Sequence, residues 1–215
     1  MLREIISTEW YTILFVLCLS ILAMAKYIFS SRFNDFLWLV GKSKYLKIYA
    51  REQKFIDQFD AFLFLNLVIS LSIFFFLGHS TFVGGISFNI GLFIKILLGI
   101  GAIILIKVLL ERLIGSLFGI DTLIDSYLFQ KTSYKNFSGL LLLPINILLV
   151  FTIPLSINLF YVIIGLLFII NLMGFITSIK THQKTILNNI FYFILYLCAL
   201  EIAPYVILYK LFINS

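Results

Sequence analysis

"FSGLLLLPINILLVFTIPLSINLFYVIIGLLFIINLMGFITSI" occupies residues 137–179 and contains no Asp, Glu, Lys or Arg. A helix needs roughly 20 apolar residues to cross the hydrocarbon core of a bilayer, so this run is about twice as long as one span. The connection at 154–156, which begins with Pro154, divides it. The run therefore predicts two consecutive membrane-spanning helices, 137–153 and 157–178, joined by a short turn.

The composition of the whole chain indicates the same class of protein. Hydrophobic side chains make up 62% of the sequence and charged side chains 12%, whereas soluble domains average about 45–50% and about 25%. In lipid every backbone N–H and C=O must be paired internally, and the sequence lacks the short alternating strands of a barrel, which leaves helices. We expect one polytopic domain over residues 1–215, an all-α bundle of about six transmembrane helices. The six windows are 10–29, 59–77, 89–110, 137–153, 157–178 and 189–212.

The distribution of basic residues predicts the orientation of the chain. Most of the 16 Lys and Arg lie on the connections after the first, third and fifth windows. The exceptions are Arg3, Lys95 and Lys210. By the positive-inside rule the basic side is cytoplasmic, so both termini are expected on the outer side. Residues 23–25, Ala-Met-Ala, resemble a signal-peptidase site, but the basic segment that follows favours retention of the first span.

Residues 33–58, between the first two windows, have the pattern of a basic amphipathic cytoplasmic segment. Asn34 or Asp35 is a candidate cap and Gly41 a candidate end for a short helix, after which a second helix begins. The second helix has a basic face and an aromatic face, which fits a helix lying among anionic lipid headgroups. The alternative is a solvated connector whose charges only set the topology. The residues of this lipid-headgroup or partner surface are Lys44, Lys47, Arg51 and Lys54.

No functional site is predicted in two further charged regions. The densest charged group is expected at the solvated border of a helix. It consists of Arg51, Glu52, Asp57 and Asp60. Residues 111–137 are expected to form a second cytoplasmic piece beneath the bundle, with Asp121 as a candidate helix cap. The cations assigned to this loop region after the third window are Lys107, Arg112, Lys131 and Lys135.

Glu201 lies in the middle of the last window, where a charge normally faces other helices or water and has a partner. Pro204 follows it and frees the carbonyl four residues earlier, which predicts a helix break beside the acid. Lys95 is the candidate ion-pair partner, at a height that differs by about 5–8 Å. The alternative is a protonated Glu201 that hydrogen bonds to Tyr205 or Asn146. In either form, stabilisation of the bundle is favoured over a proton or ion relay.

Polar residues elsewhere in the windows do not predict catalysis. The asparagines Asn66, Asn146 and Asn171 lie in three different windows, and an amide in lipid is stabilising only when it finds a partner on another helix. Cys18 and Cys198 lie alone in apolar runs and only 2 His are present, so we expect no metal site and no cofactor. No P-loop, nucleophile elbow or acid–base cluster occurs, so no catalytic residue is assigned and an enzyme is not expected. The net charge of +6 is explained by topology and headgroups, so nucleic acid is not an expected partner.

Three stretches resemble one known family. They are "RFNDFL" at 32–37, "KYLKIYAREQKFIDQFD" at 44–60 and "LEIAPYVILYK" at 200–210. On these residues the chain resembles the small polytopic inner-membrane proteins of bacteria grouped as domain-of-unknown-function family 4271, nearly from end to end. The resemblance implies a location in the bacterial cytoplasmic membrane and a general build, but it implies no activity that maps onto particular residues.

Two functions follow from these patterns as hypotheses. The leading one is a non-catalytic component or anchor of an envelope complex, with anionic lipids and a membrane protein or a second copy as partners. The rival is a small transporter or proton-coupled carrier that uses Glu201 and Lys95 beside the proline break. Whether Glu201 faces a hydrated cavity or a dry helix contact distinguishes them.

Overall fold

The computed structural model describes residues 9–41, 44–50, 57–83, 88–117, 119, 121–153 and 156–181. All regular secondary structure in these ranges is helical, which confirms the predicted all-α class for this part of the chain. The helices are α1 (Glu9–Ile28), α2 (Ser30–Leu37), α3 (Lys44–Tyr49), α4 (Gln58–Val83), α5 (Ile90–Leu117), α6 (Asp121–Phe151) and α7 (Ile157–Thr181).

Five of the described helices are long and apolar enough to cross a membrane, namely α1, α4, α5, α6 and α7. They overlap the first five windows predicted from the sequence, and their mean hydropathies lie between 1.5 and 2.6. The sixth window, residues 189–212, lies outside the described residues. The described helices are therefore those expected of a multi-pass membrane protein.

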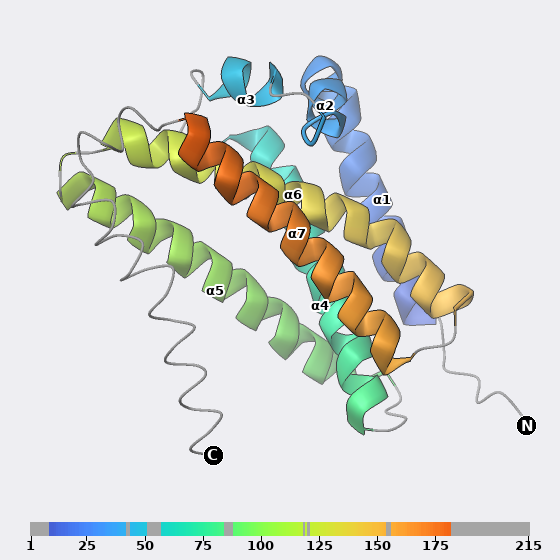
Figure 1. Cartoon of the computed structure of the whole chain (residues 1–215). Helices are drawn as coiled ribbons and strands as arrows, with labels where there is room; N and C mark the ends of the chain where they lie inside the picture. The colour runs from blue at the N-terminus through green and yellow to red at the C-terminus, as the bar shows by residue number, and fades with distance from the viewer. Residues whose placement is uncertain are drawn as a thin grey trace, which may run out of the picture.

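The centre of the bundle is formed by α4 and α6. In their most apolar stretches 61% and 50% of the residues are buried, against 22% in α1 and α7 and 6% in α5. Helices α1 and α5 pack on α4, and α7 packs mainly on α6. Each spanning helix runs opposite to the one before it, so the starts of α4 and α6 and the ends of α5 and α7 lie together with α2 and α3 at one end of the molecule (Figure 1). We call this end the α2–α3 end.

Close helix contacts depend on glycine at two positions. A Cβ atom on Gly139 of α6 would lie 2.6 Å from the Cα atom of Leu67 on α4, so a larger residue there would push the two central helices apart. A Cβ atom on Gly174 of α7 would lie 2.5 Å from the ring of Tyr134 on α6. Among the described residues no atom lies within 4 Å of such a position on Gly99 of α5, which agrees with the low burial of α5.

The predicted extent of the charged loop after the third window is wrong. Helix α5 continues to Leu117, and α6 begins at Asp121 and runs without a break to Phe151. Ile124 and Tyr127, near the start of α6, are both buried against the bundle. This packing stabilises a continuous helix where the sequence analysis expected a separate cytoplasmic piece. The four cations assigned to that loop region therefore lie on α5 and α6.

The start predicted for the first short helix is also wrong. Helix α2 begins at Ser30, directly after α1, and Phe29 caps it without any side-chain hydrogen bond. Asn34 and Asp35 consequently lie inside the helix instead of capping it. Phe33 and Phe36, which are 7% and 0% exposed, pack against the bundle. This packing stabilises α2 without a side-chain cap.

The aromatic side chains of residues 33–58 do not lie where a helix on the membrane surface would place them. Tyr45 of α3 and Phe59 at the start of α4 are both fully buried, so these rings are inside the protein and not in lipid. Phe36 contacts both, with ring centroids 5.4 Å and 5.8 Å away, and Tyr45 stacks on Phe129 of α6 at 5.7 Å. The aromatic face of this segment therefore attaches α2 and α3 to the bundle. Of its basic residues, Lys44 and Lys47 belong to α3, whereas Arg51 and Lys54 lie outside the described residues.

Candidate functional site

A charged cluster joins α2 to the start of α4. The guanidinium of Arg32 donates through Nη1 to Asp57 Oδ2, and its Nη2 lies 3.4 Å from Asp60 Oδ2. The same guanidinium lies over aromatic rings, 5.0 Å from the centroid of Tyr49 and 4.7 Å from that of Phe59. One cation is thus shared between two carboxylates and enclosed by aromatic rings. We call these five residues the shelf cluster, because they hold α2 and α3 across the end of the bundle.

The guanidinium of the shelf cluster stays charged at physiological pH. Burial of Arg32 by itself disfavours its charge, but Tyr45 and the two carboxylates outweigh this effect and raise the pKa of Arg32 above its ordinary value. Burial raises the pKa of the Tyr45 phenol, so that group stays neutral. The side chains of Asp57 and Asp60 are only 17% and 18% exposed. The prediction that these two acids form a solvated helix border is therefore wrong, because their ion pairs with Arg32 draw them inward.

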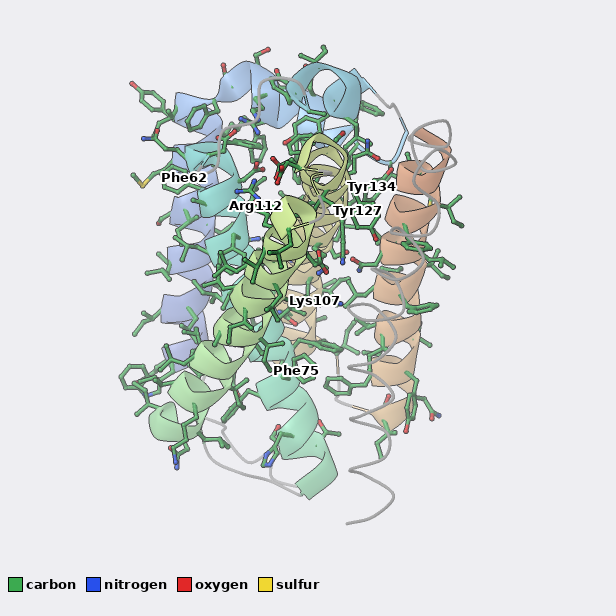
Figure 2. All side chains as sticks on the ribbon, turned by 90° about the vertical axis from the view of Figure 1, so that its left-hand side faces the viewer. Phe62, Phe75, Lys107, Arg112, Tyr127 and Tyr134 are labelled. Carbon is green, nitrogen blue, oxygen red and sulfur yellow. The ribbon has the colours of Figure 1, made fainter. Side chains whose placement is uncertain are left out.

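A second cluster lies between α5 and α6. Lys131 Nζ of α6 donates to Glu111 Oε1 of α5 at 2.6 Å, and it lies 5.6 Å from the ring centroid of Tyr127. The side chain of Glu111 is 1% exposed and that of Lys131 is 14% exposed. The pair therefore links two spanning helices in a poorly solvated place, where losing one partner strands the other charge. Figure 2 shows Lys107 on α5 at a level deeper in the bundle than Arg112 and Tyr127.

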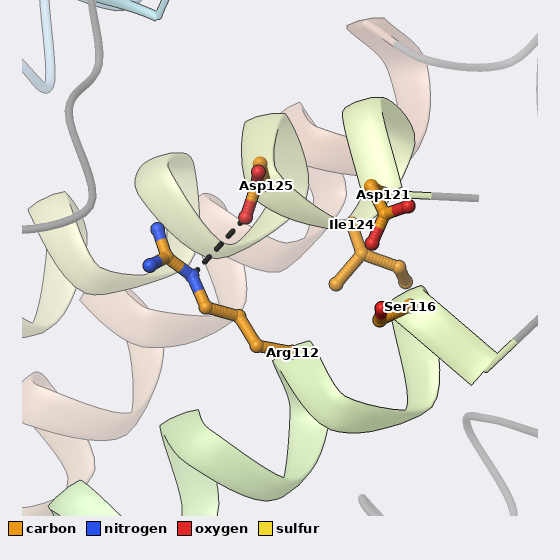
Figure 3. Close-up of a pocket in the computed structure, with 5 residues that line it drawn as sticks. All are labelled: Arg112, Ser116, Asp121, Ile124 and Asp125. Atoms are coloured by element: carbon orange, nitrogen blue, oxygen red, sulfur yellow. Dashed lines mark ion pairs between the residues drawn. The ribbon is translucent and has the colours of Figure 1, made fainter. Parts of the chain in front are cut away.

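A shallow pocket opens beside this pair, where α5 ends and α6 begins (Figure 3). Arg112 Nε lies 3.1 Å from Asp125 Oδ1, and Asp125 is half exposed. Ser116, Asp121 and Ile124 complete the lining. Since the carboxylate of Asp125 is well solvated, this ion pair is weaker than the Glu111–Lys131 pair.

Neutral polar groups lie along the contacts that α6 makes with α4 and with α7. Asn146 is fully buried and donates from Nδ2 to the backbone carbonyl of Ser70 at 2.8 Å, which ties the two helices together. Asn171 of α7 donates to Ser138 Oγ at 3.1 Å and to the carbonyl of Leu167 at 2.8 Å. Asn66 is fully buried too, but its amide forms no hydrogen bond with the residues that the structure describes.

The remaining predicted site residues are not brought together by the described structure. Lys95 lies in the second turn of α5 with an exposed side chain, and it forms no ion pair within the described ranges. Glu201, Pro204 and Tyr205 lie outside those ranges, so their pairing and the helix break stay predictions. Cys18 is buried in α1, and the described residues contain no group of three or more His, Cys, Asp or Glu able to hold a metal ion.

Several buried polar residues were missed by the sequence analysis. The most consequential is Glu111, because its position suggested a loop. The absence of a strong helix breaker between Gly101 and Gly115 is the signal that predicts a continuous helix there. The other fully or nearly fully buried residues of this kind are Ser70 and Ser72 on α4 and Gln130, Ser133 and Asn136 on α6.

Comparison with known proteins identifies a family but no relative of known activity. Residues 11–212 match the family model described as Domain of unknown function (DUF4271), which covers nearly the whole chain, including the window at 189–212. No curated protein and no solved structure matches the chain. The resemblance inferred from three short stretches is thus confirmed, and the chain belongs to the DUF4271 family.

Proposed function

We propose that this protein is a non-catalytic membrane component that binds a partner at its α2–α3 end. The observation that carries the proposal is the shelf cluster, in which Arg32 is bound to Asp57 and Asp60 and covered by two rings. Ordering two short helices across the end of a bundle costs conformational entropy, and the cluster supplies the interactions that offset it. A fixed shelf of this kind suits a binding surface better than a permeation path.

The segment that forms α2 and α3 carries exposed apolar side chains. Trp38, which follows α2, is 64% exposed, and Ile48 of α3 is 41% exposed. Trp and basic residues are typical of the headgroup region, so the shelf is suited to contact both lipid headgroups and a membrane protein. Lys44 and Lys47 of α3 add basic charge to the same segment.

The orientation of the shelf follows from the basic residues. Most of the described Lys and Arg lie on α2 and α3 or in the parts of the spanning helices nearest the α2–α3 end, which by the positive-inside rule is the cytoplasmic end. In this proposal the protein resides in a bacterial inner membrane with both termini on the outer side. The partner is then a protein of the envelope that is reached from the cytoplasmic face, or a second copy of this chain.

Affinity isolation from native membranes tests the proposal. We expect a stoichiometric partner to copurify with the wild-type protein and to be lost with Trp38→Ala. Phe168→Ala is the matched control, because Phe168 is similarly exposed, at 66%, but lies in the middle of α7. Recovery of the wild-type protein as a lone chain in several mild detergents would contradict the proposal.

A second candidate function is a small carrier, and the buried amides favour it. Asn66 and Asn136 are fully buried in the spanning part of α4 and α6, and neither amide forms a hydrogen bond with the described residues. Polar groups at such depth commonly mark substrate or proton paths. In this version Glu201 and Lys95 carry the charge, so Glu201→Gln abolishes uptake or proton flux in proteoliposomes while the protein stays folded. Unchanged flux would eliminate the carrier.

A further inference from the structure

Two amides buried between α4 and α6 have no hydrogen-bonding partner among the residues that the structure describes. Asn66 of α4 and Asn136 of α6 are both fully buried. Neither the Nδ2 nor the Oδ1 atom of either side chain forms a hydrogen bond within the described ranges. Buried polar atoms in proteins are almost always bonded to another protein group or to an ordered water molecule. Four such atoms at one helix contact therefore point to a bound molecule.

The two amides lie at nearly the same depth. Helices α4 and α6 both start at the α2–α3 end, so they run parallel (Figure 1). They touch where a Cβ atom on Gly139 would lie 2.6 Å from the Cα atom of Leu67. Asn66 precedes Leu67 by one residue. Asn136 precedes Gly139 by three residues. At about 1.5 Å of rise per residue, the depths of the two asparagines differ by about 3 Å.

The amides also lie on the same side of this contact. Successive residues of a helix are rotated by about 100°. Asn136 is therefore rotated by about 60° from Gly139 on α6. Asn66 is rotated by about 100° from Leu67 on α4, in the opposite sense. On two parallel helices that face each other, opposite rotations point to the same side, so the two side chains flank the contact together.

Helix α1 covers this side of the contact. It packs on both α4 and α6. On α6 it contacts Phe151, whose ring centroid lies 6.0 Å from that of Phe15. Phe151 follows Asn136 by 15 residues, which is a rotation of about 60°, so both lie on the same half of α6. On α4 the Cys18 thiol lies within hydrogen-bonding reach of the Ser70 side chain, one turn after the α4 amide. Three helices therefore enclose the two amides.

The carboxylates of these three helices lie away from the amides, towards the helix ends. Those of α6 precede the α6 amide by three turns or more, that of α4 precedes the α4 amide by more than one turn, and that of α1 is in its first turn, at the opposite end of the bundle. These residues are Glu9, Asp60, Asp121 and Asp125. Lys131 and Lys135 share a face of α6 that is rotated towards α5, where Lys131 binds Glu111. An ion at the amides would therefore have no counter-charge beside it.

The chemistry of the amides selects the ligand. A carboxamide oxygen accepts hydrogen bonds and its nitrogen donates them. A metal cation would satisfy the two oxygens but would leave both nitrogens without a partner, and a lipid or docked protein does not reach atoms without exposed surface. Water donates and accepts, and two hydrogen bonds through one water span up to about 6 Å. We propose that water molecules bind between Asn66 and Asn136 and bridge α4 to α6 inside the bundle.

The amount of water required is small. Globular proteins hold roughly one buried water per 27 residues, each with about three hydrogen bonds, so two waters are enough to satisfy the four amide atoms. The inference concerns a ligand inside the bundle, so it holds whether or not the α2–α3 end binds a partner. In a carrier these amides would be a hydrated step within the spanning helices.

Detection of water at the two amides is the direct test. In wild-type protein with isotope-labelled asparagine, the side-chain NH2 groups of Asn66 and Asn136 are expected to show nuclear Overhauser cross-peaks to bound water. Asn171 is the matched control, because its Nδ2 atom donates to Ser138 Oγ and to the carbonyl of Leu167, so no such cross-peak is expected. Absence of the cross-peak from either buried amide, or an equally strong one from Asn171, overturns the proposal.

Apolar substitutions test the bridge by the sign of their effect. Asn66→Leu and Asn136→Leu each leave the other amide and the water with too few partners, so each is expected to lower the thermal unfolding midpoint in detergent by about 2–6 °C. The double variant removes both amides and is expected to unfold no earlier than the worse single variant. Asn66→Leu combined with Asn171→Leu is the control, in which the two losses add.

Two results of this series overturn the bridge. A higher midpoint in each single variant would show two dry amides that leucine relieves, and additive losses in the double variant would show two independent sites. The water cross-peaks are measured on the wild type, so they decide the question even where a leucine variant does not fold.

Replacing sodium chloride with choline chloride separates water from a metal ion. The unfolding midpoint of the wild type is expected to stay the same, because water needs no alkali cation. A lower midpoint in choline chloride that appears in the wild type but not in Asn66→Leu would assign the amides to a bound cation and overturn the water site.

Discussion

The shelf cluster and the contact between α5 and α6, which we call the α5–α6 seam, arrange charge in different ways. In the shelf cluster one cation, Arg32, is shared by two carboxylates. In the seam one carboxylate, Glu111, is bound to one cation, Lys131. Both clusters lie towards the α2–α3 end, where charged groups are closest to water (Figure 1).

The difference concerns the kind of cation in each cluster. In the shelf cluster a planar guanidinium binds two carboxylates and stacks on Tyr49 and Phe59. In the seam the ammonium of Lys131 is compact, makes no planar stack and binds Glu111 at 2.6 Å. The shelf cluster therefore joins the three elements α2, α3 and α4, whereas the pair in the seam joins two helices.

The largest effect is expected from removing the only cation of the shelf cluster. Arg32→Met leaves two carboxylates buried without a partner, which should lower the free energy of unfolding by about 3 kcal/mol, near the lower end of the range for broken buried pairs. The side chain of Arg32 is 15% exposed, which limits the loss. Chemical unfolding in mixed micelles measures it.

Arg32→Lys is the control for this variant. It keeps the charge but loses the planar fork and the ring stacking, so an intermediate stability is expected. Equal stability of Arg32→Lys and the wild type would show that the cluster acts only as a point charge, and the contrast with the lysines of the seam would fail.

The next effect is expected in the seam. Glu111→Gln removes the acid from a site where the carboxylate is 1% exposed, so Lys131 loses its charged partner. A loss of about 1.5–3 kcal/mol in the free energy of unfolding is expected, as for a hydrogen bond to a charged group. Asp125→Asn, which alters the half-exposed pair with Arg112, should cost about 0–1 kcal/mol. Equal losses in the two variants would show that burial does not separate the two pairs.

The sequence predicts the spanning helices better than it predicts either charged region, for a physical reason. Apolar run length determines which segments enter lipid, so the five described spans were found before any contact was known. Run length also places a boundary wherever charges begin, and this rule failed at α5 and α6. There a helix continues past Glu111 and Lys131 because the two charges neutralise each other across the helices.

The shelf cluster was not predictable from local pattern for a related reason. Arg32 and Asp57 are 25 residues apart, and nothing in either stretch alone indicates that they meet. The aromatic periodicity of residues 33–58 was visible, but periodicity does not reveal whether a face contacts lipid or protein. Burial of Tyr45 and Phe59 decides for protein, and only tertiary contacts supply that information.

Packing between the central helices gives a neutral reference for both charged regions. Gly139→Ala places a methyl group 2.6 Å from the Cα atom of Leu67, where no side chain can yield. Overpacking of this kind costs about 1–3 kcal/mol. Gly99→Ala on α5 meets no atom of the described residues within 4 Å and should be neutral or stabilising by up to about 1 kcal/mol, since alanine favours helix. Thermal unfolding in detergent compares the two, and a larger loss from Gly99→Ala would contradict the open face of α5.

The smallest effect should come from the second acid of the shelf cluster, and it sharpens the comparison most. Asp57 binds Arg32 and also accepts a hydrogen bond from the backbone N–H of Phe59 at 3.0 Å. Asp60 lies 3.4 Å from Arg32, and its buried Oδ1 atom accepts no hydrogen bond from the residues that the structure describes. Asp57→Asn should therefore cost about 1–2 kcal/mol, since it weakens a charged pair and a helix cap.

Asp60→Asn should change the free energy of unfolding by less than about 1 kcal/mol, because Arg32 keeps its better partner and one of two repelling carboxylates disappears. The cluster thus tolerates loss of an acid, while the seam does not tolerate loss of Glu111. If chemical unfolding in mixed micelles instead ranks Asp60→Asn below Glu111→Gln in stability, the second carboxylate of the shelf cluster contributes more than the buried acid of the seam, and the contrast between the two clusters fails.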